Sequence, residues 1–187
     1  MAHTTVKDKA KKAFENLKGD FKYTNKLQAP RIEKVIVSTT IGSVKDNKKK
    51  ELMLDRVTRI TGQKPVTTTA KKSIATFKLR AGDASGYKVT LRGEKMWSFL
   101  EKIVNIALPR TKDFRGVAVT GVDPMGNFSF GIKEHTVFPE TSDESIQDIF
   151  SLGVTVVTTS KNAKETKTLL DTLGFLFKKV EDKKSKK

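Results

Sequence analysis

The sequence contains no cysteine and only two histidines among its 187 residues. The absence of cysteine excludes disulfide bonds, thiolate metal sites and cysteine nucleophiles, and it fits a reducing compartment. The histidines, His3 and His135, lie far apart in the chain, and we expect His135 to be a surface or half-buried residue rather than a catalytic base. No apolar run approaches the roughly 20 residues of a membrane span. The lysines near the N-terminus are not followed by the apolar segment of a secretory signal, so we expect a soluble cytoplasmic protein.

Acidic residues are scarce relative to basic ones. The chain has 37 Lys and Arg against 21 Asp and Glu, which gives a net charge of +16. An excess of this size points to a polyanionic partner. With 36% hydrophobic residues and 11 Phe, the chain has enough apolar side chains for a folded domain. The charge therefore belongs to a globular protein and not to a wholly disordered basic chain.

The charge is unevenly distributed along the chain. Residues 70–95 contain seven basic and two acidic side chains. Residues 178–187 contain six lysines and almost nothing apolar, which predicts a flexible basic tail. Residues 134–152 contain five acidic side chains and no Lys or Arg, so we expect this stretch to lie away from any polyanion or to face a basic protein.

Apolar side chains at helical spacing predict four helices. The predicted helices cover residues 5–18, a segment from Asp46 or Asn47 to Gly62, residues 94–107, and a segment from Asn162 to Gly174. The third has the broadest apolar face and is expected to be the central core helix, with Trp97 buried on that face and Pro109 ending the helix.

Alternating or β-branched segments predict the strands. These segments are Ile32–Thr39, Ala75–Arg80, Tyr87–Arg92, Val117–Val122, Phe128–Ile132 and Gly153–Thr159. Two of them, Ala75–Arg80 and Tyr87–Arg92, are expected to flank a Gly82–Gly86 break and to share a basic face. A hairpin is expected between Val117–Val122 and Phe128–Ile132.

The mixture of strands and helices lacks regular βαβ alternation. It predicts an α+β fold, with an antiparallel β-sheet, helices packed mainly on one face, and an open face for RNA. Lys88, Thr90 and Arg92 would lie on that open face. Such a face is typical of a solvated sheet, but lysines and hydroxyls also match phosphates and 2′-hydroxyls. No stacking aromatic side chains are obvious on it, so RNA would dock through its backbone and shape.

Two other classes of function have weaker support. Four scattered carboxylates could hold magnesium for nucleic-acid cleavage, although nothing in their spacing places them together: Asp113, Glu134, Glu140 and Asp143. A phosphate-binding Walker pattern is absent, because Gly131 is followed by Ile132-Lys133. The lysine tail alone would support attachment to an anionic membrane.

Several longer runs, in order along the chain, resemble the bacterial large-subunit ribosomal protein L5 family. The runs are Gln28–Lys34, Thr61–Pro65, Lys88–Trp97, Pro109–Gly116 and Gly126–Gly131, within a resemblance that extends from about Phe21 to Phe177. The resemblance implies a non-enzymatic ribosomal protein without a cofactor, located in the cytoplasm. It also implies a single domain over residues 1–177, with an N-terminal part at about 21–80 and a C-terminal part at about 84–177.

The resemblance implies a set of partners as well. The sheet face would bind 5S rRNA in the central protuberance, and a long basic loop would reach toward P-site tRNA. Further expected partners are 23S rRNA, neighbouring large-subunit proteins and a protein of the small-subunit head, with no membrane contact.

By position, the 5S-contacting polar residues of the family correspond to Gln63 and Thr90, with Ser38 standing where the family has asparagine. Together with the basic sheet face, the expected 5S rRNA site is Ser38, Gln63, Lys88, Thr90 and Arg92. The tRNA-facing loop would run from Arg80 to Lys88 with its tip at Asp83-Ala84-Ser85. Its basic side chains would be Lys71, Lys72, Lys78 and Arg80.

Overall fold

A computed structural model describes residues 5–42, 46–112, 114–141 and 149–178. Its centre is a five-stranded sheet in the order β2-β3-β1-β5-β4, in which every neighbouring pair is antiparallel. The strands are β1 (Ile32–Thr40), β2 (Val66–Thr69), β3 (Ala84–Leu91), β4 (Phe128–Ile132) and β5 (Leu152–Thr158). The helices are α1 (Val6–Lys11), α2 (Ala13–Phe21), α3 (Asn47–Thr61), α4 (Gly93–Lys102), α5 (Leu108–Arg110) and α6 (Ala163–Leu173). The predicted α+β class is confirmed.

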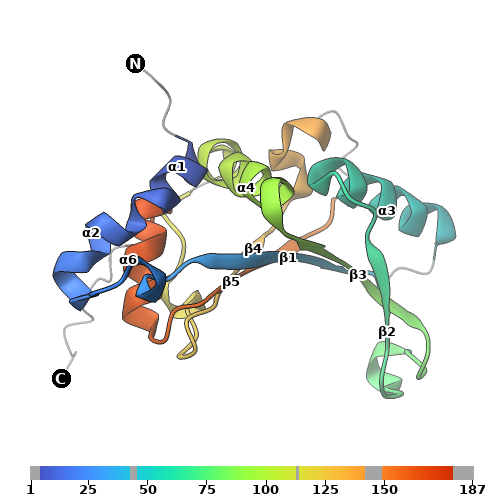
Figure 1. Ribbon diagram of the computed structural model, residues 1–187. Coiled ribbons are helices and arrows are strands. Elements are labelled where there is room, and N and C mark those ends of the chain that lie inside the picture. Colours follow the sequence, from blue (N-terminus) through green and yellow to red (C-terminus); the bar gives the residue numbers. More distant parts are fainter. Residues whose placement is uncertain (1–4, 43–45, 113, 142–148, 179–187) are drawn as a thin grey trace, which may run out of the picture.

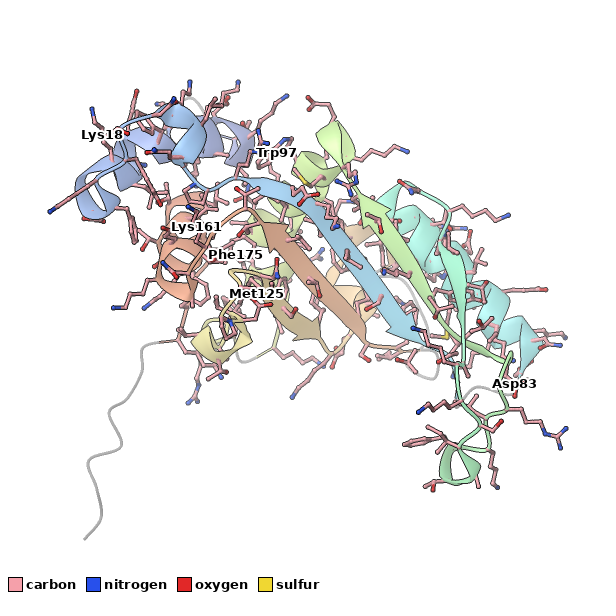
Figure 2. The ribbon with its side chains drawn as sticks, turned by 60° about the horizontal axis from the view of Figure 1, so that its bottom comes forward. Lys18, Asp83, Trp97, Met125, Lys161 and Phe175 are labelled. Carbon is pink, nitrogen blue, oxygen red and sulfur yellow. The ribbon has the colours of Figure 1, made fainter. Side chains whose placement is uncertain are left out.

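The helices leave one face of the sheet uncovered. In Figure 1, α3 and α4 lie above the sheet, and α1, α2 and α6 gather at its left end. Alternation along the strands buries one set of side chains under the helices, including Val35, Val37, Leu91, Val154 and Val156. Figure 2 shows the opposite face of the sheet turned toward the reader, with no helix in front of it. We call this surface the open face.

Both ends of α3 and the C-terminal end of α6 agree with their sequence signals. Asp46 caps α3, because its side chain accepts a hydrogen bond from the backbone N–H of Lys48 at 3.0 Å. Gly62 ends the same helix in the left-handed conformation, with φ +67°. Gly174 ends α6 in the same conformation, with φ +103°. The first predicted helix is interrupted at Lys12 and continues past Gly19 to Phe21.

The central helix differs from its prediction in two ways. A π-helical turn at Ile103–Ala107 follows α4, and the helical conformation then continues through Pro109 to Arg110. Proline cannot donate to the preceding turn, and a wider turn before it accommodates the missing hydrogen bond. Trp97 is only partly buried against the core, whereas Phe99 and Leu100 are 2% and 0% exposed. The prediction of a buried Trp97 was wrong, because the face of α4 that packs on the sheet is centred on Phe99 and Leu100.

Two predicted strands are absent from the described part of the chain. Residues Ala75–Phe77 form a 3₁₀ turn, and the threonine-rich β2 takes the place beside β3 that was expected for this segment, with β1 on the other side of β3. The segment around Val117–Val122 makes only single bridges to Phe177 and Phe128, so the predicted hairpin was wrong and the partner of β4 is β5. In both cases apolar alternation occurred in a segment whose side chains pack irregularly or are exposed.

Candidate nucleic-acid interface

The open face is assembled from the outward-pointing residues of all five strands. Strand pairing aligns Thr90 with Ile36, Ile36 with Thr155, and Thr155 with Ser129, so one row crosses the sheet from β3 to β4. Its Ser129 and Thr155 hydroxyl oxygens lie 3.0 Å apart. Hydroxyls spaced along a row can donate to and accept from phosphates and 2′-hydroxyls.

A second row runs beside the first. It aligns Val66 with Lys88, Lys88 with Ser38, Ser38 with Gly153, and Gly153 with Gly131. The Ser38 hydroxyl donates to the Gly153 carbonyl over 3.5 Å, a long contact that leaves this exposed side chain available to another partner. Because the two glycines carry no side chain, a partner's backbone can approach this part of the sheet closely.

Arg92 stands at the end of β3, where the open face meets the helices. Its guanidinium lies 3.4 Å from the Glu33 carboxylate, and both side chains are about half exposed. An exposed ion pair of this kind contributes only about 0–1 kcal/mol, so a phosphate can replace the carboxylate at small cost.

Gln63 lies in the connection between α3 and β2. Its carbonyl accepts a hydrogen bond from the Thr61 hydroxyl at 3.0 Å, and the Lys95 ammonium donates to the carbonyl of neighbouring Gly62 at 3.0 Å. The backbone of Gln63 is therefore held while its side chain is exposed. The structure thus brings Ser38, Lys88 and Thr90 together on adjoining strands, with Arg92 and Gln63 at one margin.

The basic loop runs from Ala70 to Asp83 and differs from its predicted position. Its base is closed by hydrogen bonds between Ala70 and both Gly82 and Asp83. Ala84 and Ser85 belong to β3, so the predicted tip at Asp83-Ala84-Ser85 was wrong. The chain actually reverses further out, where Ile74 and Leu79 exchange backbone hydrogen bonds of 3.0 and 3.3 Å.

The basic side chains of this loop are all exposed: Lys71, Lys72, Lys78 and Arg80. The tip also carries apolar side chains, since Phe77 is 64% and Ile74 is 45% exposed. Lys78 adopts the left-handed conformation at φ +52°, and this places the turn directly after Phe77. Figure 2 shows the loop extending away from the sheet beyond Asp83. An exposed aromatic ring among cations can stack on a nucleobase.

Sequence reasoning missed several residues of the open face and the tip of the loop. Thr155 and Ser129 were not singled out, although each alternates with buried apolar residues in its strand. That alternation was the available signal. Phe77 was assigned to a strand face, because an apolar side chain in an alternating segment ordinarily points into a core.

The alternative magnesium site finds no support in the described residues. Glu134 lies 4.0 Å from Lys112, and Glu140 forms an ion pair with Lys102. Asp113 and Asp143 lie outside the described residues. Among residues that the structure describes, no three or more His, Asp or Glu side chains gather into a possible metal site. His135 is fully buried, contrary to expectation, and its ring stacks on Phe150 with 4.1 Å between centroids.

Membrane attachment depended on the lysine tail. Only Lys178 of that tail lies within the described residues, so the expectation of a flexible tail falls almost entirely outside them. Within the described part of the chain, no helix is long and apolar enough to cross a membrane.

Comparison with known proteins identifies the family. Residues 25–80 match the model of ribosomal protein L5, and residues 84–177 match the model of the C-terminal part of the ribosomal L5 family. A large ribosomal subunit protein uL5 of Ureaplasma urealyticum is 48% identical over 170 residues, which cover 90% of this chain and 92% of the relative. The protein of the same name from Nitratidesulfovibrio vulgaris is 49% identical over 164 residues, covering 87% and 92%. That from Malacoplasma penetrans is 44% identical over 179 residues, covering 95% and 96%. The chain therefore belongs to the ribosomal protein L5 family, whose members are structural, non-enzymatic components of the large ribosomal subunit.

Proposed function

We propose that the open face binds 5S rRNA and so anchors the protein in the central protuberance of the large subunit. The observation that carries this proposal is the pair of rows across the sheet, in which hydroxyls and glycines lie beside Lys88, with Arg92 directly after the end of β3. A wide surface of hydroxyls with one cation among them and another at the margin suits the shallow minor groove of an RNA helix, where 2′-hydroxyls and phosphates are presented.

The contacting residues in this proposal are Ser38, Gln63, Lys88, Thr90 and Arg92. Lys88 and Arg92 would neutralise phosphates, which supply affinity without regard to sequence. Ser38, Gln63 and Thr90 are uncharged and would fix the position of the RNA through hydrogen bonds. This division of roles follows from their chemistry and can be tested separately for each group.

The basic loop is proposed to contact P-site tRNA. Its tip projects away from the open face and is ordered by its own backbone hydrogen bonds, so it can reach a second RNA while the sheet holds the first. The remaining partners proposed from membership of the family are 23S rRNA, neighbouring large-subunit proteins and a small-subunit head protein. Residues 1–177 are proposed to form one domain, because strands from both matched segments alternate within one sheet.

The experiment is a titration of the full chain with labelled 5S rRNA and with an unrelated RNA duplex of equal length. Because the open face has both neutral and charged contacts, 5S rRNA should bind more tightly than the duplex at every salt concentration. Equal affinity for the two RNAs across the salt range would contradict a specific 5S site.

A further inference from the structure

A groove beside the outer strand of the sheet is not used by the 5S site proposed above. Its volume is about 470 Å³, and it lies between β4 and the segment that follows α5. Strand β4 is the last strand of the sheet, and Figure 2 shows this edge with Met125 marking the loop beside it. The volume falls within the range of about 300–1,000 Å³ that is usual for sites of small organic ligands. A unit of nucleotide size can therefore enter it.

The charged side chains lining this groove are cationic among the residues that the structure describes. They are Lys112, Arg115, Lys133 and Lys178, all exposed. Lys112 has the nearby carboxylate of Glu134, but at 4.0 Å and with 86% of the lysine side chain exposed, so it is still open to another anion. Four cations around one groove produce a field that attracts a polyanion.

The floor and walls of the groove combine hydroxyls, glycine and aromatic rings. Thr120 and Ser129 contribute hydroxyls, and Gly131 has no heavy atom within 4 Å of the position that a Cβ would occupy. Phe114 and Phe130 line the groove and are partly buried against the core, and the Phe130 ring stacks on Phe128 with 5.3 Å between centroids. A basic groove with aromatic rings is the arrangement by which proteins hold single-stranded nucleic acid, with cations along the backbone and rings under the bases.

We propose that this groove is a second RNA-binding site and that it holds a single-stranded segment of RNA without sequence preference. The groove adjoins the open face, because Ser129 belongs both to its lining and to the hydroxyl row. An RNA chain leaving a helix docked on the open face can therefore enter the groove directly. The site does not depend on 5S rRNA, since its chemistry recognises any phosphodiester backbone and any base with an accessible ring face.

The test compares two double variants with the same loss of charge. Arg115→Gln with Lys133→Gln removes two groove cations, and Lys12→Gln with Lys18→Gln removes two exposed cations from α1–α2, in the helical layer. The probe is a labelled short oligouridylate, titrated against the full-length chain over a range of salt. The salt slope is the slope of log affinity against log salt concentration, and each contact with a single-strand phosphate contributes ~0.7 to its magnitude. If each of the two groove cations contacts one phosphate, the groove variant should have a slope smaller in magnitude by about 1.4. Its affinity near physiological salt should fall about tenfold. The control variant should retain nearly the wild-type slope.

A crosslinking experiment tests the location without changing the charge. A photoreactive group attached at Thr120→Cys should crosslink to the oligouridylate, and the same group at Thr168→Cys, on α6, should not. Equal loss of affinity in both double variants, or equal crosslinking from both positions, would overturn the proposal. Polyglutamate serves as a second probe. If the wild type binds it as tightly as oligouridylate, and the groove variant loses the same affinity for both, the groove binds an acidic protein segment instead. If 5S rRNA failed to bind specifically, the proposed function would be rejected. The result for oligouridylate in the groove would not change, because oligouridylate contains no 5S sequence.

Discussion

Ser38 and Lys88 are direct partners on the neighbouring strands β1 and β3, and both side chains are exposed on the open face. One can donate or accept a hydrogen bond, and the other supplies a full positive charge. In the proposed 5S site, affinity and specificity would therefore have different chemical origins at adjacent positions of the same surface.

Substitutions of neutral and of charged contact residues should affect the salt dependence of 5S rRNA affinity differently. Thr90→Ala combined with Gln63→Ala removes no charge, so the salt slope should not change. If these groups are buried against the RNA, each truncation leaves an unpaired polar group and costs about 1–3 kcal/mol. Lys88→Gln should instead flatten the slope by ~0.7–0.9. A loss from the neutral pair that is equally large for an unrelated duplex would reject the 5S site.

The basic loop should act on tRNA and not on 5S rRNA. Replacing Lys71, Lys72, Lys78 and Arg80 with Ala should weaken P-site tRNA binding in ribosomes assembled with the variant protein. The loop should keep its shape, because its closing hydrogen bonds join backbone atoms. Binding of 5S rRNA, measured by gel shift, should largely persist. If a folded variant lost 5S binding, the loop would be part of the 5S rRNA site, contrary to this proposal.

Phe77 should contribute to RNA binding and little to folding. Its side chain is 64% exposed, so Phe77→Ala should leave the melting temperature nearly unchanged. If the ring stacks on a base of the tRNA, the substitution should cost about 1–3 kcal/mol of binding. Leu27, which is 85% exposed far from the loop in sequence, provides the control substitution Leu27→Ala. Equal tRNA affinity for the two variants would exclude stacking by Phe77.

Phe99 and Trp97 should differ in their contribution to stability. Phe99 is 2% exposed and stacks on Phe138 at 6.2 Å between ring centroids, so Phe99→Ala should cost about 3–5 kcal/mol. Trp97 is only partly buried, and Trp97→Ala should cost clearly less. Urea unfolding of both variants measures the difference. A larger loss for Trp97→Ala would mean that α4 packs through the other part of its apolar face.

Much of the fold followed from local signals. The capping residue Asp46, the terminal Gly62 and the alternation in β5 each act through neighbouring residues, and the structure agrees with them. The loop tip was misplaced because Phe77 and Leu79 alternate as in a strand, whereas the chain reverses there: Ile74 and Leu79 exchange backbone hydrogen bonds, and Lys78 between them adopts the left-handed conformation. Trp97 was misassigned because helical periodicity does not specify which part of a broad apolar stripe meets the sheet.

The candidate site was predictable to the extent that it depends on strand alternation. Lys88 and Thr90 were expected on one polar face, and the structure places both on the open face. The basic groove at β4 could not be predicted, because Arg115 and Lys133 come from segments that meet only in the folded chain. Membership of the family makes the chain a cytoplasmic, non-enzymatic ribosomal protein, so the rival interpretation as a nucleic-acid-cleaving enzyme was wrong.

In the proposed complex the open face, and not the helical layer, meets 5S rRNA. The chain contains no cysteine, so a single introduced cysteine can carry a photoreactive crosslinker at one defined position. Ser38→Cys places it on the open face, and Ser98→Cys places it at an equally natural serine, exposed on α4. The measurement is the yield of protein–5S rRNA crosslink from each position in the full-length chain. Crosslinking should be efficient from position 38 and weak from position 98, and the reverse pattern would mean that the helical layer meets 5S rRNA.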